Sequence, residues 1–465
     1  MLIPELILVG MALALILTAR RIQKTPAAPV GTVLAAVASA IASGWAFSSG
    51  ARTAFGGMMI LDEYSQFFKV LIGATLAIAT LLSVRSLDRD HIPRAEYHAL
   101  LLLAATGMMF AASARDLLPL YLGLELMTLC SIILVGIRVE RPMANEAAIK
   151  YFLLSSFASA MLIYGISLTY GATRSTDYGA IASALSHQGS QTNLLLLVAI
   201  GLVTAGLAFK IAAVPLHAWA PDAYQGASAP VAAFLAAGSK AVGLAALGRV
   251  CLAAYGAEAH ALSMLLMALA GSSIVVGSIV GLAQTDMKRM LAYSSIAHAG
   301  YALLGLAAGT PQGISATMTY SFFYVFMTMG AFGVVAALGE RGEKLAGFRG
   351  LAAQRPGMAL LMLVFLMSLT GIPPTAGFAA KFVVILSLVR VGHFALAVLA
   401  AGCSVVSAFF YMRVAVLMYM NAPEEPAPSR FPSALLAALA VAGIVTLIGG
   451  VSPGSVAPWT VAPVP

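Results

Sequence analysis

The chain has 465 residues, of which 61% are hydrophobic and only 9% are charged, and its formal net charge is +8. So few charged residues cannot cover a water-facing surface, which excludes a set of soluble domains and indicates a protein that lies in lipid. The basic residues are scattered singly between apolar runs and form no aromatic-laced basic patch. This pattern excludes a nucleic-acid-binding protein.

The cysteines and histidines do not form the patterns of a metal or redox site. Cys130, Cys251 and Cys403 each lie alone inside an apolar segment, without a CxxC pair. The seven histidines include no convincing haem-ligand pair, and no glycine-rich phosphate loop follows a strand. The sequence therefore predicts that this chain itself carries no redox centre, zinc site or nucleotide site.

Apolar runs long enough to cross a bilayer, roughly 20 residues each, recur from end to end. They are apolar on every face, which excludes a transmembrane β-barrel. The first run resembles a signal peptide, but Glu5 replaces its basic start, so we interpret it as the first span. The sequence predicts an all-α polytopic membrane protein of about 14 transmembrane helices, near 2–19, 31–48, 65–84, 97–114, 116–137, 148–170, 193–213, 228–249, 263–283, 290–307, 313–338, 357–390, 394–418 and 433–451.

Prolines interrupt two of these spans. The run 357–390 is too long for one crossing and contains Pro373 and Pro374, which predicts one helix broken into two halves, and 193–213 runs into Pro215. Interrupted helices in corresponding places of two halves are typical of inverted repeats. We therefore expect helices 1–3 in 1–96, a first inverted five-helix repeat in 97–249, a second in 263–418, and the last helix with a tail in 433–465.

Lysine and arginine are distributed unequally between alternate loops. The loops at 20–30, 85–96, 138–147 and 340–356 hold most of them, whereas the other set holds few. Since basic residues resist translocation, the rich set is predicted to face the cytoplasm and both termini the outer side. The rich set includes Arg20, Arg21, Lys24, Arg85, Arg89, Arg94, Arg138, Arg141, Lys288, Arg289, Arg341, Lys344, Arg349 and Arg355.

Two ionisable residues lie deep within predicted spans. Glu125 is nine residues into its span, which places it about 14 Å deep, and a buried charge there costs about 3 kcal/mol. Lys210 lies beside a helix break that frees backbone carbonyls and admits water. A lysine and a carboxylate form a proton site whose affinity depends on their separation. The alternatives are a structural carboxylate and a snorkelling lysine.

Lys240 and Lys381 repeat the pattern of one cation among small apolar residues that leave room for water. Unpaired, the three lysines would cost on the order of 8–10 kcal/mol, which favours a function. Weaker candidates are His217 and His298, since a lone membrane histidine is often only a helix contact. Lys150 is another weak candidate. It lies at i,i+4 from Glu146, a spacing that suits an ion pair, and it could equally be an anchor at the membrane interface. Asp62 with Glu63 is expected to cap a helix, and Lys69 has no assigned role.

Three long stretches, 210–227, 286–301 and 371–382, carry a family resemblance. There the sequence resembles the antiporter-like membrane subunits of respiratory complex I, most closely the bacterial kind called subunit N, over nearly the whole chain. The resemblance implies a proton-handling axis of one glutamate on the fifth span and lysines on the seventh, eighth and twelfth. Glu125, Lys210, Lys240 and Lys381 match these positions one by one. Lys381 in place of a glutamate argues against subunit M.

The resemblance also implies the setting of the chain. It implies a proton-translocating subunit of NADH:quinone oxidoreductase in a bacterial inner membrane, with other membrane subunits as partners. NAD, FMN, iron–sulfur clusters and quinone would then belong to partner subunits. A subunit of a multi-subunit cation/proton antiporter or hydrogenase-type complex remains an alternative, since it shares the fold. A structural subunit whose charges no longer conduct is a third, disfavoured because all four charges are present.

Overall fold

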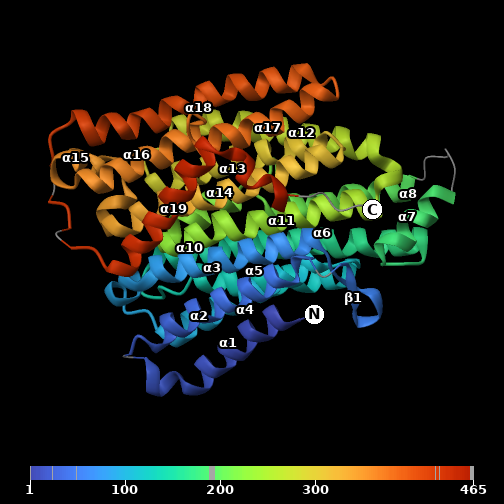
Figure 1. Cartoon of the computed structure of the whole chain (residues 1–465), viewed down its shortest axis with the longest axis horizontal. Coiled ribbons are helices and arrows are strands. Elements are labelled where there is room, and N and C mark those ends of the chain that lie inside the picture. The colour runs from blue at the N-terminus through green and yellow to red at the C-terminus, as the bar shows by residue number, and fades with distance from the viewer. Residues whose placement is uncertain are drawn as a thin grey trace.

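The structure, a computed structural model, describes residues 2–23, 25–48, 50–187, 194–424, 426–428 and 430–460, so Lys24 and the end of the tail lie outside the described residues. The long helices run side by side along one axis (Figure 1). Their bounds are α1 Ile3–Ile22, α2 Ala27–Trp45, α3 Glu63–Arg89, α4 Arg94–Ser113, α5 Leu117–Val135, α6 Pro142–Thr173, α7 Tyr178–His187, α8 Leu194–Lys210, α9 Trp219–Gly226, α10 Ala229–Phe234, α11 Lys240–Arg249, α12 Ala259–Leu282, α13 Met287–Ala307, α14 Pro311–Leu338, α15 Leu351–Gln354, α16 Pro356–Thr370, α17 Ala376–Arg390, α18 Phe394–Met420 and α19 Ser433–Val451.

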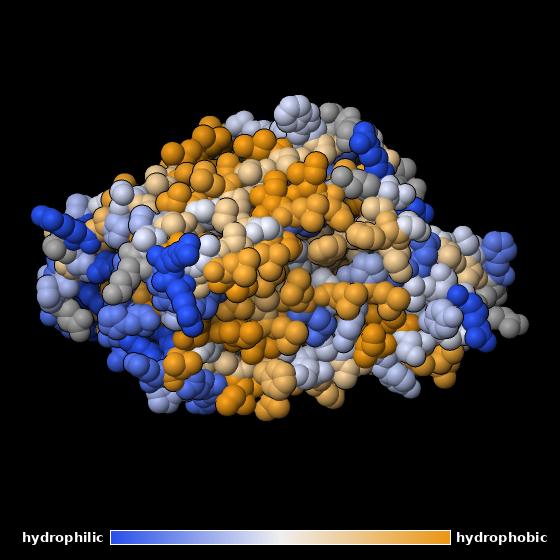
Figure 2. All heavy atoms as spheres, turned by 90° about the horizontal axis from the view of Figure 1, so that it is seen from below, coloured by the Kyte–Doolittle hydropathy of each residue, from blue (hydrophilic) through white to orange (hydrophobic). Residues whose placement is uncertain are grey.

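The predicted all-α polytopic class is confirmed. Within the described residues, twelve helices are long and apolar enough to cross a membrane, the stretch from α10 to residue 254 counting as one of them. Two shorter apolar helices, α8 and α16, account for the two spans predicted to be broken. In a space-filling view, apolar side chains occupy much of the middle of one face and hydrophilic ones gather towards its ends (Figure 2).

Several helices are longer than the apolar runs that predicted them. α2 begins at Ala27 and not at 31, and α3 continues to Arg89, past the predicted end at 84. α6 begins at Pro142 and not at 148, because proline is well suited to the first turn of a helix. Hydropathy marks only the part immersed in lipid, whereas the helix itself continues into the polar interface.

Two small elements were not predicted. A hairpin of β1, Arg52–Ala54, and β2, Met59–Leu61, lies between α2 and α3, with Arg52 opposite Leu61. The short helix α7 follows Asp177, whose carboxylate accepts a hydrogen bond from the backbone N–H of Ala180 at 2.9 Å. Both elements lie outside the spans, where the apolar pattern used for the prediction carries no information.

The two broken helices are present as predicted. α8 ends at Lys210, and the chain resumes its helix in α9 after residues 211–218. α16 ends at Thr370, and Gly371 comes next with a left-handed φ of 88°, before α17 begins at Ala376. A third irregularity was missed: a π-helical turn, Leu235–Ser239, joins α10 to α11 directly before Lys240.

One end of the bundle gathers the loops that are rich in arginine, and we call it the arginine-rich end. There Asp90 lies 3.4 Å from Arg138 and 3.7 Å from Arg141. Burial alone would raise the pKa of Asp90, but these neighbours and Arg89 hold it below its usual value. α1 begins and α19 ends at the opposite end (Figure 1), as an even number of crossings requires.

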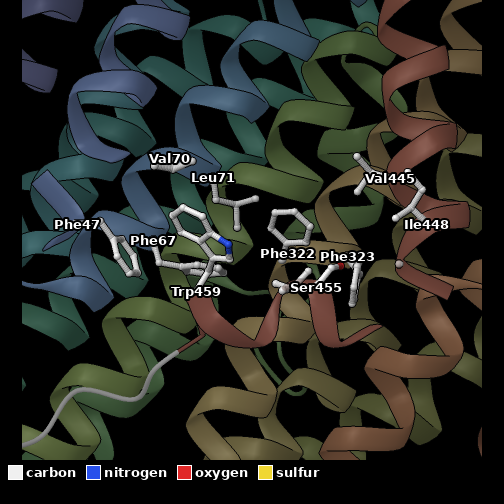
Figure 3. Close-up of a pocket in the computed structure, with 12 residues that line it drawn as sticks. Phe47, Phe67, Val70, Leu71, Phe322, Phe323, Val445, Ile448, Ser455 and Trp459 are labelled. Carbon is white, nitrogen blue, oxygen red and sulfur yellow. The ribbon is translucent and has the colours of Figure 1, made fainter. Parts of the chain in front are cut away.

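An apolar cavity of about 360 Å³ lies between α3, α14 and α19 (Figure 3). The segment after α19 closes one side of it, where Trp459 packs against Phe47 with ring centroids 5.1 Å apart. Phe67, Phe322 and other apolar side chains form most of the remaining wall. No charged side chain among the described residues lines this cavity, so it is separate from the buried charges of the bundle.

Two buried ion pairs tie the N-terminal helices to the rest. Lys69, which had no assigned role, lies 2.7 Å from Glu5 of α1, and both side chains are almost wholly buried. Asp62 caps α3 as predicted, by accepting from the backbone N–H of Ser65. It also accepts two hydrogen bonds of 2.8 Å from Arg249, which the sequence did not reveal. Burial raises the pKa of Asp62, but Arg249 and Ser65 together hold it below its usual value.

We predict that Asp62→Asn lowers the free energy of unfolding by about 3 kcal/mol at neutral pH, because it leaves the Arg249 guanidinium buried without its counter-charge. Asparagine keeps the helix cap, so the change isolates the charge. Since the folded-state pKa of Asp62 is lowered, its contribution is present above the unfolded-state pKa and is lost as pH falls through the folded-state value. Thermal unfolding of the detergent-solubilised protein at several pH values measures this.

The matched control is Asp88→Asn, because Asp88 is 55% exposed in its pair with Arg94 and should change stability by less than about 1 kcal/mol. A second change, Arg249→Met on the Asp62→Asn background, should restore much of the loss. If Asp62→Asn and Asp88→Asn destabilised the protein equally, the buried Asp62–Arg249 pair would not be the stabilising interaction.

Candidate functional site

Glu125 and Lys210 form an ion pair within the bundle. Glu125 lies on α5 and Lys210 is the last residue of α8, where the helix breaks, and Lys210 Nζ lies 3.2 Å from Glu125 Oε1. The ammonium also donates to Thr128 Oγ1 at 2.7 Å, and Ser159 of α6 donates to the same carboxylate. The sequence did not give the distance between Glu125 and Lys210, and the structure shows that the two side chains are in direct contact.

The two partners differ in burial. The Lys210 side chain is 1% exposed, whereas Glu125 is 23% exposed. Glu125 lies on the α5 face that also carries the exposed side chains of Leu122 and Leu129. The carboxylate thus lies at the perimeter of this chain and not at its centre.

Lys240 begins α11 and is buried, directly after the π-helical turn. Its ammonium donates to the backbone carbonyl of Ser295 in α13 at 2.5 Å. Gly243, one turn further on, packs against α8 so closely that a Cβ there would lie 2.5 Å from Ile211 and 3.5 Å from Lys210. The glycine therefore brings the helix of Lys240 against that of Lys210.

His298 lies on α13, and we call the series Glu125, Lys210, Lys240, His298 and Lys381 the row. The residue is almost wholly buried, and its Nδ1 lies 2.6 Å from the Tyr320 hydroxyl of α14. Its Nε2 lies 3.4 Å from the Tyr411 hydroxyl of α18. The ring is close enough to both Lys240 and Lys381 for their charges to act on it. His298 thus lies between the two lysines, with a hydroxyl at each ring nitrogen.

Lys381 lies at the second helix break. From α17 it donates at 2.8 Å to the backbone carbonyl of Thr370, the last residue of α16, and at 2.8 Å to Ser404 Oγ. Its ammonium also lies 4.6 Å above the Tyr301 ring. Gly371 makes room for this side chain, because a Cβ there would lie 2.9 Å from Lys381 Cδ. Within the part of the chain that the structure describes, the charge of Lys381 is held by neutral groups.

The two weaker candidates His217 and Lys150 lie in different surroundings. His217 lies in the break after α8, close to the backbone of Pro215 and near enough to Lys240 for their charges to interact. Lys150 lies outside the row: it is 46% exposed and pairs with Glu146 at 2.6 Å and with Asp222 at 3.1 Å. The i,i+4 pair is as predicted, and its surroundings fit an anchor at the arginine-rich end.

Sequence reasoning missed the hydroxyl groups that connect the charges. They come from α5, α6, α13, α14 and α18, and a lone serine or tyrosine within a span carries no signal of its own. Tyr293 to Tyr301 do show a three- to four-residue spacing of polar side chains on α13, which could have marked its inward face. The connecting residues are Thr128, Ser159, Ser295, Tyr301, Tyr320, Tyr324, Ser404 and Tyr411.

This fold and this row of buried charges define a polytopic membrane protein that carries titratable groups through the interior of its helical bundle. The chain belongs to the family described as "NADH:quinone oxidoreductase/Mrp antiporter, TM", whose sequence profile matches residues 114–408.

Individual relatives agree with this membership. The chain is 42% identical over 447 residues to NADH-quinone oxidoreductase subunit N 2 of Rhizobium meliloti (strain 1021), covering 94% of this chain and 92% of the relative. It is 36% identical to a chain of respiratory complex I from Thermus thermophilus with bound Aureothin, with a TM-score of 0.85 over 98% of this chain and 99% of that one. A chain of the Mrp complex from Dietzia sp. DQ12-45-1b shares the fold at 20% identity, with a TM-score of 0.87 over 99% of this chain and 96% of that one.

We predict that Glu125→Gln reduces proton pumping per quinone reduced severalfold while leaving membrane insertion intact. The change removes the charge that Lys210 contacts but keeps the hydrogen-bonding shape, and a neutral side chain costs less to insert. Proton pumping and quinone reduction are measured together in vesicles that hold the assembled complex. Glu146→Gln, at an exposed carboxylate, is the matched control. Unchanged pumping in Glu125→Gln would show that the carboxylate is structural.

Proposed function

We propose that this chain is the proton-translocating membrane-arm subunit, of the kind called N, of a bacterial NADH:quinone oxidoreductase. The observation that carries the proposal is the row from Glu125 through Lys210, Lys240 and His298 to Lys381. Glu125 contacts Lys210, the helix of Lys240 packs against Lys210 through Gly243, and His298 is close to both Lys240 and Lys381. Each member can bind and release a proton, and hydroxyls lie between them. The reaction of the whole complex is that of a translocating oxidoreductase, of which this chain moves the proton.

Lys240 and Lys381 suit this task because both are held by groups that tolerate a neutral amine. Lys240 and Lys381 donate to backbone carbonyls and a serine, and these acceptors remain satisfied by an N–H of neutral lysine. Burial disfavours the charged form, while a carboxylate such as Glu125 favours it. A change in the Glu125–Lys210 pair would therefore shift the charge balance of the row. His217 is proposed as an auxiliary relay near Lys240.

Partners are proposed from the exposed side of Glu125. A carboxylate facing lipid is costly, so another polypeptide is expected to cover the α5 face around it. We propose other membrane subunits of the complex, especially the neighbouring antiporter-like subunit and the small membrane subunits. NAD, FMN, iron–sulfur clusters and quinone are assigned to partner subunits, and the site is assigned to the bacterial inner membrane.

We also propose that 97–249 and 263–418 are inverted repeats flanked by helices 1–3 and the last helix. The broken pairs α8/α9 and α16/α17 occupy corresponding places in the two halves, and each break lies next to a lysine of the row. Repeats that place a site at their interrupted helices are typical of membrane transporters.

A cation/proton exchanger is the second candidate, and the fold shared with the Mrp chain favours keeping it. Both machines would use the same row, and they differ in whether quinone reduction drives it. Co-purification of the native protein with quinone-reducing activity separates them: activity supports the redox-driven subunit, and its absence with retained cation exchange supports the exchanger.

We predict that the arginine-rich end faces the cytoplasm. A single cysteine at Asp88, which is 55% exposed there, should react with a membrane-impermeant maleimide only in inverted vesicles. A cysteine at exposed Ser183 in α7, beyond the opposite end of α6, should react in right-side-out vesicles. The reverse labelling pattern would overturn the orientation.

We predict that Lys210→Ala and Lys381→Ala each depress proton translocation and quinone reduction together, by roughly tenfold or more, because a blocked proton step stalls a tightly coupled electron step. Lys381→Arg should not rescue, since arginine stays protonated and cannot release its proton within a cycle. Both rates are measured in vesicles, with assembly checked on native gels. Wild-type rates in Lys381→Arg would refute a proton-releasing role for Lys381.

A further inference from the structure

A hollow of about 680 Å³ opens between α14, α17 and the segment that follows α19, and we call it the Arg390 hollow. It lies at the end of the bundle opposite the arginine-rich end, where α19 ends (Figure 1). Its wall, as far as the structure describes it, contains no member of the row, so the proposed function does not use it. The wall includes Ser315, Thr319, Phe382, Leu386, Arg390 and Thr460.

The part of the wall on α17 changes from apolar to cationic along one face of the helix. The side chains that line the hollow recur every three to four residues, which places them on a single stripe. Phe382 in this stripe is 53% exposed, and Arg390, in the last turn of α17, lies about 12 Å further along the helix. The hollow therefore offers an apolar surface between the helices and a guanidinium at its mouth.

The charges at the mouth favour an anion. Arg390 is exposed and forms no ion pair within the part of the chain that the structure describes. No aspartate or glutamate among the described residues lines the hollow. α14 begins at Pro311 in the same wall, and the N-terminal end of its dipole is positive. An arginine in the last turn of α17 also suits the dipole of that helix, but this alone does not require an apolar hollow beside it.

The segment after α19 forms a wall that is held in place. Ser315 and Thr319 of α14 each donate a hydrogen bond of 3.3 Å to Thr460 Oγ1. Ser455 and Trp459 of the same segment line the apolar cavity described above, beside the phenylalanines of α14 (Figure 3). The segment thus separates the cavity from the Arg390 hollow, and its bonds to α14 give the hollow a defined shape.

We propose that the Arg390 hollow binds one anionic phospholipid, with the phosphate at Arg390 and an acyl chain along Phe382 and Leu386. A planar guanidinium matches a phosphate with two parallel hydrogen bonds. The apolar wall favours a lipid over a free phosphate ion, which gains nothing from such side chains. A zwitterionic head group would bring an ammonium for which the described wall has no carboxylate. The proposal is independent of proton translocation, since it needs only the bilayer and the hollow.

The test uses the assembled complex in phosphatidylcholine vesicles that contain a small fraction of phosphatidylglycerol with a photoreactive diazirine in one acyl chain. After illumination, mass spectrometry identifies the labelled peptides. We expect labelling of 379–390 and 311–319 to exceed severalfold that of the lipid-exposed face of α1 around Leu17, which is 85% exposed. Unlabelled phosphatidylglycerol should compete, whereas phosphatidylethanolamine and inorganic phosphate should not.

Arg390→Gln should reduce the labelling of these two stretches severalfold, because it removes the charge that holds the phosphate. Arg174→Gln is the matched control, since Arg174 is an exposed arginine at the end of α6 and is not part of the wall, so labelling should be unchanged. Leu386→Trp leaves the charge in place but fills the apolar part, and it should also reduce labelling. Native gels check assembly of each variant.

Each contrary outcome overturns a stated part of the proposal. Equal labelling in the wild type and in assembled Arg390→Gln would overturn the site, because the phosphate would not be held by Arg390. Labelling no greater than on α1 would show an ordinary lipid surface or a hollow covered by another subunit, and would also overturn it. Equal competition by phosphatidylethanolamine would overturn the anionic class, and competition by inorganic phosphate would overturn the lipid. None of these results changes the proposed function.

Discussion

The need to satisfy every backbone polar group without water governs this molecule. A regular helix satisfies its own carbonyls, so a free carbonyl in a span appears only where a helix is interrupted. Lys381 donates to the last carbonyl of α16, Lys210 ends α8, and Lys240 comes directly after a π-helical turn. Interruption and charge therefore occur together along the chain. At Lys381 the break itself provides an acceptor for the ammonium, and the ammonium satisfies the break.

The same constraint explains why the ends of the row differ. At one end Lys210 meets a carboxylate, which favours a charged lysine, whereas Lys381 meets only a carbonyl, a serine and an aromatic face among the described residues. A charge at Lys381 is thus less well compensated than one at Lys210. The protonation of Lys381 is therefore more sensitive to the charges of its neighbours than that of Lys210. In this way a change at Glu125 can be felt at the other end of the row.

Much of this could be predicted from the sequence because apolar length and proline breaks are local signals. The spans, the two broken helices and the places of Glu125 and Lys210 along their helices depend on residues close together in the chain. The Lys69–Glu5 and Asp62–Arg249 pairs could not be predicted, since they join residues far apart in sequence that only packing brings together. The exposure of Glu125 was missed because the position of a residue along a span gives its depth but not the direction of its side chain.

The π-helical turn before Lys240 was missed for a related reason, since small residues such as Gly238 and Ser239 permit it without requiring it. The turn rotates α11 about its axis relative to α10, so that Lys240 faces α13 while Gly243 faces α8. A regular helix would place these two residues at a different angle relative to α10. The π-helical turn therefore sets the direction in which α11 presents both residues relative to α10. Because this arrangement depends on backbone geometry at the centre of the bundle, it is independent of whichever partner supplies the energy, and a pump and an exchanger can share it unchanged.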